Sequence, residues 1–209
     1  MTKMTIPIAS TKGATQPIGI VLAGGLSSRM GTDKASLILD GESLLLRARR
    51  HLLETGCLPV IMSGKPRTPW PDQSVSDEIE ISGPMSGIIA CVNFLSQLEP
   101  SNQPLVFIPV DAPLLNRIAL TRLLDEAALA DACIYECNPL PLVIRLTRDV
   151  IRKIKIMDDR IKSGKSCSVS AFLKLVNTRA LVPTTIESEL LRNINTPLEW
   201  KTLQHELTH

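Results

Sequence analysis

The sequence predicts a single α/β domain in which a mostly parallel sheet is flanked by helices. Short apolar runs suited to buried strands alternate with helical segments along the chain, a pattern typical of parallel sheets covered on both faces. Two of these runs end in residues suited to ligands, a glycine pair and an aspartate, and open parallel sheets place their ligands at that carboxyl edge. With 209 residues the chain can bury one sizeable core.

The first expected elements follow residues 1–17, whose Ser, Thr, Gly and Pro content predicts a flexible tail before a domain over 18–209. The β-branched run Ile18–Leu22 predicts a strand. Apolar residues at helical spacing predict a helix over Leu44–Gly56, because the closing glycine suits the left-handed conformation that ends many helices. The run 58–62 predicts the next strand.

Further elements continue the alternation. Gly83-Pro84 predicts the start of a helix with an apolar stripe, because proline suits the first helical position. In order, the remaining expected elements are a strand at 105–110, a helix at 115–129, strands at 132–135 and 140–144, a helix at 150–156, a basic loop at 160–165 and a final helix at 198–207.

A glycine-bearing loop follows the first strand and ends in cations. In Leu22-Ala23-Gly24-Gly25 the adjacent glycines can take positive φ and bring N–H groups close to an anion. Arg29 and Lys34 then supply positive charge, the first as a fork that can grip phosphate oxygens and the second as a point charge. The loop predicts binding of a nucleoside triphosphate. A plain strand-to-helix turn, which glycine pairs also mark, is the alternative.

Two common phosphate-loop templates do not fit. A dinucleotide fingerprint needs Gly-x-Gly-x-x-Gly, but here the glycines are adjacent and the next one, Gly31, follows five other residues. The segment Ser163–Ser166 mimics the end of a Walker A loop, yet Asp159 stands where the first glycine belongs and no apolar strand precedes it. We expect that segment to be a surface turn.

Asp111 ends the apolar run 105–110, at the edge of the sheet where ligands bind. Mg²⁺ prefers one or two protein carboxylates together with triphosphate oxygens, so one aspartate can be enough to hold a metal–nucleotide complex. The pattern therefore predicts a Mg²⁺ ligand. A turn-forming aspartate before Ala112-Pro113 is the alternative.

Four segments are similar, in the same order and spacing, to those of one enzyme family. They are Leu22–Lys34, Gly83–Ile88, Pro109–Pro113 and Asn193–Pro197. Together they resemble the molybdenum cofactor guanylyltransferases, the molybdopterin-guanine dinucleotide biosynthesis protein A family, over about Ile18–Leu207. The resemblance implies a single-domain Rossmann-like nucleotidyltransferase fold. It also implies transfer of GMP from GTP to molybdopterin, with or without bound molybdenum, and release of pyrophosphate.

The resemblance also implies residue roles. Arg29 and Lys34 would be catalytic, and Asp77 would accept hydrogen bonds from guanine unless it is only an exposed loop carboxylate. Asn193 and Asn195 would lie near the metal or the pterin phosphate, unless they form an Asx turn that caps the last helix. The nucleotide would be bound by Leu22, Ala23, Gly24, Gly25, Lys34, Ser63, Asp77 and Asp111, the last of which would also hold the metal.

Three positions depart from the family pattern. Ser63 stands where an asparagine is frequent, and Asn138 stands where the family has histidine. Ser166 is the third departure, because it lies in the loop Gly164-Lys165-Ser166, which usually carries arginine in the family and here offers only Lys165 as a cation. These departures leave open a catalytically silent nucleotide-binding module that serves a partner oxidoreductase.

Other nucleotidyltransferases are the nearest enzymatic alternatives. Pterin cytidylyltransferases carry Ala-Ala-Gly where this chain has Ala23-Gly24-Gly25, so Gly24 leaves more room and favours guanine. Sugar-phosphate nucleotidyltransferases usually have a Pro-Leu-Thr-type segment after the loop and a longer chain, and neither is present here.

Composition excludes several other functions. A formal net charge of +2 and 3% aromatic residues argue against a nucleic-acid surface. No apolar segment is long enough for a membrane span, and the N-terminal stretch lacks the apolar region of a secretory signal. Five cysteines without Cys-x-x-Cys spacing predict reduced, mostly buried thiols in a cytoplasmic protein. The family resemblance, in contrast to the composition, implies other molybdenum cofactor biosynthesis proteins or acceptor molybdoenzymes as protein partners.

Overall fold

The computed structural model describes residues 15–24, 33–76, 83–96 and 102–208. The strands in these residues are β1 (Ile18–Leu22), β2 (Ile38–Leu39), β3 (Glu42–Ser43), β4 (Val60–Ser63), β5 (Ser74–Val75), β6 (Pro104–Pro109), β7 (Ala132–Tyr135), β8 (Asn138–Arg145) and β9 (Thr178–Leu181). Seven of them form one sheet in the order β5-β4-β1-β6-β8-β7-β9, and β2 pairs with β3 separately. In the large sheet β8 alone runs antiparallel to its neighbours. The predicted mostly parallel sheet is confirmed.

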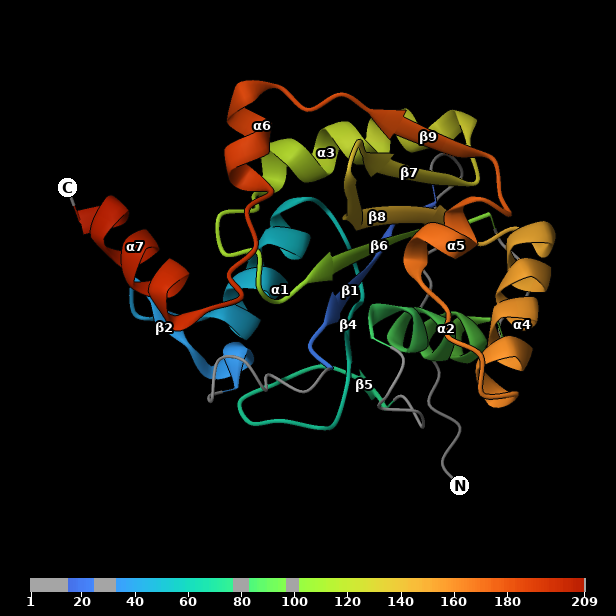
Figure 1. The fold of residues 1–209 in the computed structure, drawn as a ribbon, viewed down its shortest axis with the longest axis horizontal. Helices are drawn as coiled ribbons and strands as arrows, with labels where there is room; N and C mark the ends of the chain where they lie inside the picture. The colour runs from blue at the N-terminus through green and yellow to red at the C-terminus, as the bar shows by residue number, and fades with distance from the viewer. Residues whose placement is uncertain (1–14, 25–32, 77–82, 97–101, 209) are drawn as a thin grey trace.

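Helices cover both faces of this sheet (Figure 1). They are α1 (Leu44–Glu54), α2 (Pro84–Leu95), α3 (Arg117–Glu126), α4 (Arg148–Lys162), α5 (Val169–Leu173), α6 (Thr185–Leu190) and α7 (Pro197–Thr208), with 3-10 turns η1 (Lys34–Ser36) and η2 (Ala127–Leu129). α2, α4 and α5 pack on one face, and α1 and α3 pack on the other. The chain is thus a three-layer α/β structure, as predicted.

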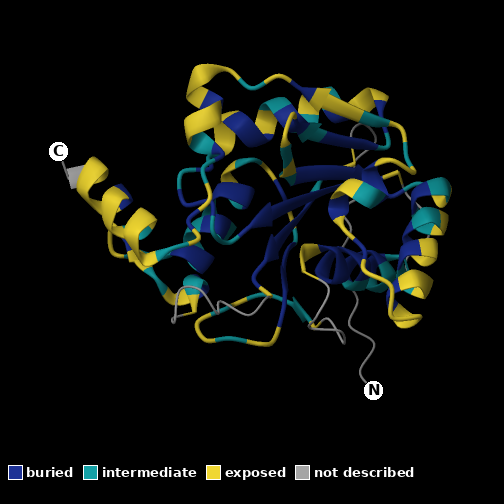
Figure 2. Ribbon diagram, in the orientation of Figure 1, coloured by how far each residue is buried: buried dark blue, intermediate teal, exposed yellow. Residues whose placement is uncertain are grey.

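β1 contributes side chains to the core on both faces of the sheet, because successive side chains of a strand point to opposite faces. Ile18, Ile20 and Leu22 belong to the cluster under α2 and α4, whereas Val21 belongs to the cluster under α1 and α3. β1 and β4 are buried along their whole length, while α7 is exposed over most of its surface (Figure 2). β1 is therefore held from both sides, which makes its carboxyl end a rigid place to build a site.

Most expected elements are confirmed with small shifts of their ends. The helix expected from 115 begins at Arg117, because the Asn116 side chain accepts a hydrogen bond from the N–H of Ile118 at 2.9 Å and caps the helix. The expected turn at Ser163–Ser166 is confirmed, with all four residues exposed.

The expected boundary between a helix at 150–156 and a basic loop at 160–165 is wrong. α4 continues through Lys162, because Met157 and Ile161 extend the buried stripe begun by Val150 and Ile154 at helical spacing. The basic residues at 160–162 are therefore on the last turn of a helix, where cations favour the negative end of the helix dipole.

Residues 1–14 of the expected tail lie outside the described residues. Pro17 is already tied to the domain, because its carbonyl accepts a hydrogen bond from the N–H of Leu58 at 2.8 Å. In the described parts of the chain, no helix combines the length and apolar character that crossing a membrane requires.

Candidate active site at the carboxyl edge of the sheet

The carboxyl ends of β1 and β6 lie side by side, since the two strands pair in parallel with Leu22 opposite Pro109. The N–H of Val110 donates to the carbonyl of Leu22 at 3.2 Å and extends this pairing past the strand end. A cavity of about 410 Å³ opens at this edge. It is lined by Leu22, Ala23, Gly24, Asp33, Lys34, Gly83, Pro84, Pro109, Val110, Asp111, Asn138, Pro139, Leu140 and Asn193.

Three predicted site residues from distant parts of the chain meet in a hydrogen-bonded cluster. Nζ of Lys34 donates to Oδ2 of Asp111 at 2.7 Å and to Oδ1 of Asn195 at 2.9 Å. The Lys34 and Asp111 side chains are only 15% and 23% exposed, so their attraction is screened less than that of a surface pair. The N–H of Ile194 also donates to the backbone carbonyl of Asp111 at 2.8 Å. This bond holds the Asn193–Asn195 segment against the end of β6.

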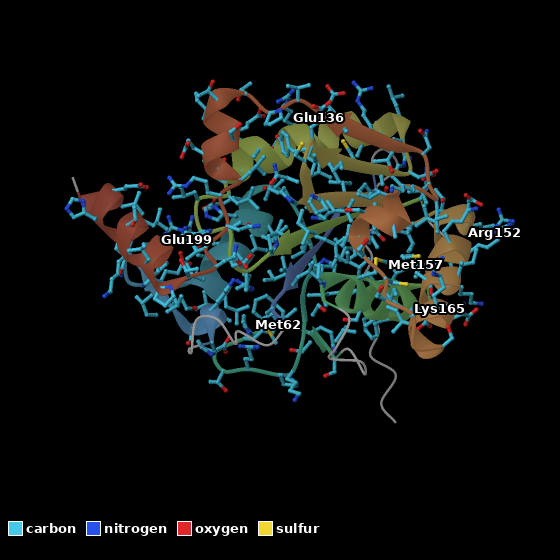
Figure 3. All side chains as sticks on the ribbon, viewed as in Figure 1. Met62, Glu136, Arg152, Met157, Lys165 and Glu199 are labelled. Carbon is cyan, nitrogen blue, oxygen red and sulfur yellow. The ribbon has the colours of Figure 1, made fainter. Side chains whose placement is uncertain are left out.

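Asn195 is available to Lys34 because it does not cap α7. Thr196 does so instead, since its hydroxyl accepts from the N–H of Glu199 at 3.2 Å. The Glu199 carboxylate accepts in return from the N–H of Asn195 at 2.6 Å and that of Thr196 at 3.0 Å. These backbone donors, Asn195 first, hold the pKa of Glu199 below its usual value. The alternative that Asn195 itself caps the last helix is therefore wrong. Glu199, at the start of α7, is labelled in Figure 3.

Both polar backbone groups of Ala23 are bound by the neighbouring strand and the segment after it. The N–H of Ala23 donates to the carbonyl of Ser63 at 2.9 Å, and its own carbonyl accepts from Nη2 of Arg67 at 2.9 Å. Gly64 has φ +137°, and a Cβ added there would lie 3.1 Å from the backbone N of Gly24. The start of the glycine loop is thus packed directly on the backbone that follows β4.

Ser63 does not line the cavity. It is 1% exposed, and a Cβ added to Gly87 on α2 would come within 2.4 Å of its hydroxyl oxygen. Ser63 thus fills the space where α2 approaches β4 most closely. A nucleotide contact from its hydroxyl remains a prediction that this geometry does not favour.

Arg67 is the residue at this site that we did not predict from the sequence. Its guanidinium donates to the carbonyl of Ala23 and pairs with the carboxylate of Asp33. Among the described residues its Nε has no hydrogen-bond partner although the atom is buried, and burial lowers the pKa of the side chain. No motif surrounds it, so the one sequence signal was an arginine in a proline-rich stretch between two short strands.

The start of α2 forms another wall of the cavity. Gly83 takes φ +64° and Pro84 occupies the first turn of the helix, as predicted. Gly83 and Pro84 both line the cavity. A helix start of this kind directs N–H groups and the positive end of the helix dipole toward bound anions.

The start of β8 also lines the cavity. Asn138, Pro139 and Leu140 line the cavity there, and Nδ2 of Asn138 donates to the carbonyl of Glu136 at 3.2 Å. Lys165 does not line the cavity, and it lies across the molecule from Glu199 in Figure 3.

Three predicted site residues, Gly25, Arg29 and Asp77, lie outside the described residues. Their roles remain predictions. Among the residues that are described, Leu22, Ala23, Gly24, Lys34, Asp111 and Asn193 line the cavity, and Asn195 contacts it through Lys34.

The oxygen atoms at Asp111 and Asn195 suit a hard divalent cation. In the described parts of the chain, no group of three or more His, Cys, Asp and Glu side chains could hold a metal by itself. Mg²⁺ does not need such a group, because it usually takes one or two carboxylates and completes its shell with water and phosphate. The Lys34 ammonium already sits between these two oxygens, which indicates that they favour positive charge. The residues present therefore fit Mg²⁺ brought in with a triphosphate.

Comparison with known proteins agrees with this geometry. Residues 19–165 match the family described as MobA-like NTP transferase domain. The molybdenum cofactor guanylyltransferase of Xanthomonas euvesicatoria is 32% identical over 190 residues, which cover 90% of this chain and 94% of the relative. A probable molybdenum cofactor guanylyltransferase of Mycobacterium avium is 30% identical over 196 residues, covering 90% of this chain and 95% of the relative.

Solved structures share the fold. Molybdopterin-guanine dinucleotide biosynthesis protein A from Archaeoglobus fulgidus superposes with a TM-score of 0.69 at 20% identity, covering 91% of this chain and 98% of that one. The 2-C-methyl-D-erythritol 4-phosphate cytidylyltransferase of Thermus thermophilus reaches a TM-score of 0.64 at 10% identity, covering 92% of this chain and 100% of that one. These two structures show the fold. The family match and the full-length relatives show in addition that this chain belongs to the MobA-like NTP transferase family, together with the molybdenum cofactor guanylyltransferases.

Proposed function

We propose that this chain is a nucleotidyltransferase that moves GMP from GTP to molybdopterin and releases pyrophosphate. The observation that carries the proposal is the cluster of Lys34, Asp111 and Asn195 beside the glycine-loop backbone, at the edge of the sheet where ligands bind. The full-length relatives named molybdenum cofactor guanylyltransferase support the choice of reaction.

The reaction requires charge neutralisation and alignment more than acid or base chemistry. A terminal phosphate oxygen of the pterin forms a bond to the α-phosphorus of GTP, while the bond from that phosphorus to the oxygen bridging to the β-phosphate breaks. The leaving electron pair stays on pyrophosphate. The attacking phosphate monoester is already largely ionised at neutral pH, so the chain needs to supply no base. Its task is to hold two anions in line and to stabilise the charge on the leaving group.

Lys34 is placed for the second task. Its ammonium lies at the cavity wall between Asp111 and Asn195, and a lysine of this kind can move from protein oxygens to phosphate oxygens as a point charge. We assign the same role to Arg29. Asp111 would hold Mg²⁺ when it is bound, and the metal would neutralise the triphosphate.

The cavity lining offers different groups to the two substrates. The glycine-loop backbone and the start of α2 suit the triphosphate, and Gly24 leaves room for a purine. Asn138 and Asn193 also line the cavity and offer polar groups, and we assign these to the pterin and its phosphate. Asp77 would select guanine.

The proposed function also implies a cell compartment and protein partners. All five cysteines are free thiols, and four of them are buried, which suits a cytoplasmic protein. Other cofactor-biosynthesis proteins or acceptor molybdoenzymes would deliver the pterin and receive the product.

A pyrophosphate-release assay with GTP, Mg²⁺ and molybdopterin tests the proposal. We expect release that depends on both substrates and a preference for GTP over CTP or ATP of at least about tenfold, which needs only about 1.4 kcal/mol. Equal use of GTP and CTP would remove the guanine assignment, and a preference for CTP would make the chain a cytidylyltransferase instead. GTP binding without any release would make it a silent nucleotide-binding module.

A further inference from the structure

Arg67 joins two separate walls of the cavity without lining it. Nη2 donates to the carbonyl of Ala23 at 2.9 Å, and Nη1 pairs with the carboxylate of Asp33. Ala23 and Asp33 both line the cavity, and each precedes a further lining residue, Gly24 and Lys34 respectively. One guanidinium thus fixes both ends of the segment that we assign to the triphosphate.

The bond to Asp33 reaches the predicted catalytic lysine through one turn of helix. Asp33 uses its other carboxylate oxygen to accept from the N–H of Ala35 at 3.2 Å, which caps η1. η1 begins at Lys34, whose ammonium binds Asp111. A shift of Arg67 would therefore pass through the Asp33 carboxylate to the backbone at the start of η1, where Lys34 forms part of the cavity wall.

The Arg67 side chain keeps its position although the described residues leave one of its donors, the buried Nε, without an acceptor. The side chain is 23% exposed, and Nε is buried without a partner among the described residues. A buried N–H left unpaired is costly. The two bonds to Ala23 and Asp33, together with the packing of the preceding backbone, hold the guanidinium there in spite of this cost.

The backbone before Arg67 is fitted to the glycine loop. Gly64 takes φ +137°, and its nearest neighbours are backbone atoms of Ala23 and Gly24 at 3.1 to 3.4 Å from a Cβ added to it. Only glycine accepts both this φ and this contact. The segment between β4 and β5 is therefore shaped to pass against Gly24, which brings Arg67 within reach of Ala23.

We propose that Arg67 is a positioning residue for nucleotide binding, which holds the Ala23-Gly24 and Asp33-Lys34 walls in the arrangement that the triphosphate needs. It acts through these residues and does not touch the reacting atoms. The inference rests on the proposed function in that GTP is taken as the ligand.

The test compares Arg67→Ala and Arg67→Lys with the wild type, both in GTP binding with Mg²⁺ and in turnover with molybdopterin. For Arg67→Ala we expect the dissociation constant and the KM for GTP to rise about tenfold, because loss of pre-organisation weakens binding most. We expect kcat to fall less than about threefold, because the Lys34 ammonium keeps its bonds to Asp111 and Asn195. Arg67→Lys should lie between the two, since an ammonium can reach Asp33 or the Ala23 carbonyl but cannot bridge them as a fork does.

A double-mutant cycle shows whether Arg67 acts through Asp33. Asp33→Asn keeps an oxygen that can cap η1 but removes the charge that Arg67 binds. In that background Arg67→Lys should raise the KM for GTP by less than about twofold, because the two changes break the same interaction. Additive effects would contradict the proposed route.

Arg49→Ala is the matched control. Arg49 pairs bidentately with Asp72 in the same connecting segment, and its side chain is similarly exposed at 26%. Loss of this pair should leave the KM for GTP unchanged. If Arg49→Ala raises KM as much as Arg67→Ala, or if both Arg67 variants bind GTP like the wild type, the proposal is overturned. A wild-type chain that neither binds GTP nor releases pyrophosphate would instead overturn the proposed function. If Arg67→Ala fails to fold, Arg67→Lys and the cycle decide.

Discussion

Replacement of Glu187 by glutamine should cost about 3 kcal/mol of folding free energy at neutral pH. Glu187 is 4% exposed and lies on α6. Its Oε2 pairs with Arg122 and accepts from the N–H of Thr184 at 2.8 Å, and the Tyr135 hydroxyl lies 3.0 Å from its Oε1. A buried carboxylate is retained here because every partner around it is a donor.

The magnitude follows from the pKa of this carboxyl group. Burial by itself would raise the pKa of Glu187, but hydrogen bonds from Arg122, from Thr184 and from Tyr135 together lower it from 4.5 to about 2. At about 1.4 kcal/mol for each pKa unit, this difference is about 3 kcal/mol in favour of the folded, ionised form. The neutral amide of glutamine cannot replace the charge, and its NH₂ group would face donors.

The pH dependence has a definite sign. Because the pKa is lower in the folded chain, the stabilisation is fully present above the unfolded pKa of 4.5 and is lost as pH falls toward about 2. Urea unfolding of wild type and Glu187→Gln, followed by circular dichroism, should therefore show a difference of about 3 kcal/mol near pH 7 that shrinks near pH 3. Turnover at neutral pH should change little, since Glu187 does not line the cavity.

Glu189→Gln is the control for this change. The Glu189 side chain is 64% exposed and pairs with Arg192 on the surface, so its loss should cost less than about 0.5 kcal/mol at either pH. A cost for Glu187→Gln below about 1 kcal/mol, or the same cost at both pH values, would refute the reasoning.

Five further substitutions test the site. Asp111→Asn keeps the side-chain size but removes charge, so turnover should fall about a hundredfold while GTP affinity without Mg²⁺ changes little; near-normal turnover would make Asp111 a turn residue. Lys34→Ala and Arg29→Ala should each lower the single-turnover rate at saturating GTP more than they weaken GTP binding, Lys34→Ala more strongly; weaker binding at an unchanged rate would limit both to docking. Gly24→Ala should shift the GTP-to-CTP ratio toward CTP in competition assays, and an unchanged ratio would remove the steric argument. Gly64→Ala should lower the free energy of unfolding by about 1 to 2 kcal/mol in urea titration and weaken GTP binding, because its φ is strained and its Cβ meets the Gly24 backbone.

Local patterns in the sequence were enough to predict those strands and helices that carry a distinctive residue pattern of their own. β1 and β6 are continuous apolar runs that are buried on both faces, and α2 starts at a Gly-Pro pair. The start of α6 also has a pattern that is visible in the sequence, the capping box in which the side chains of Thr184 and Glu187 each bind the other residue's backbone N–H. β9 carried no such signal, since three of its four residues are not buried and only its pairing with β7 makes it a strand.

The sequence by itself determined the family, the sheet, and the chemical types present at its carboxyl edge: glycines, a lysine and an aspartate. These depend on residues close together in the chain, so pattern and spacing carry them. The tertiary structure decided which groups meet. Lys34 and Asn195 are 161 positions apart in the sequence yet form a hydrogen bond. They meet because the N–H of Ile194 donates to the carbonyl of Asp111, which holds the segment around Asn195 against the carboxyl end of β6. Arg67 could be found only in three dimensions, since its role depends on the approach of the Gly64 backbone to Gly24, a contact that no local propensity encodes.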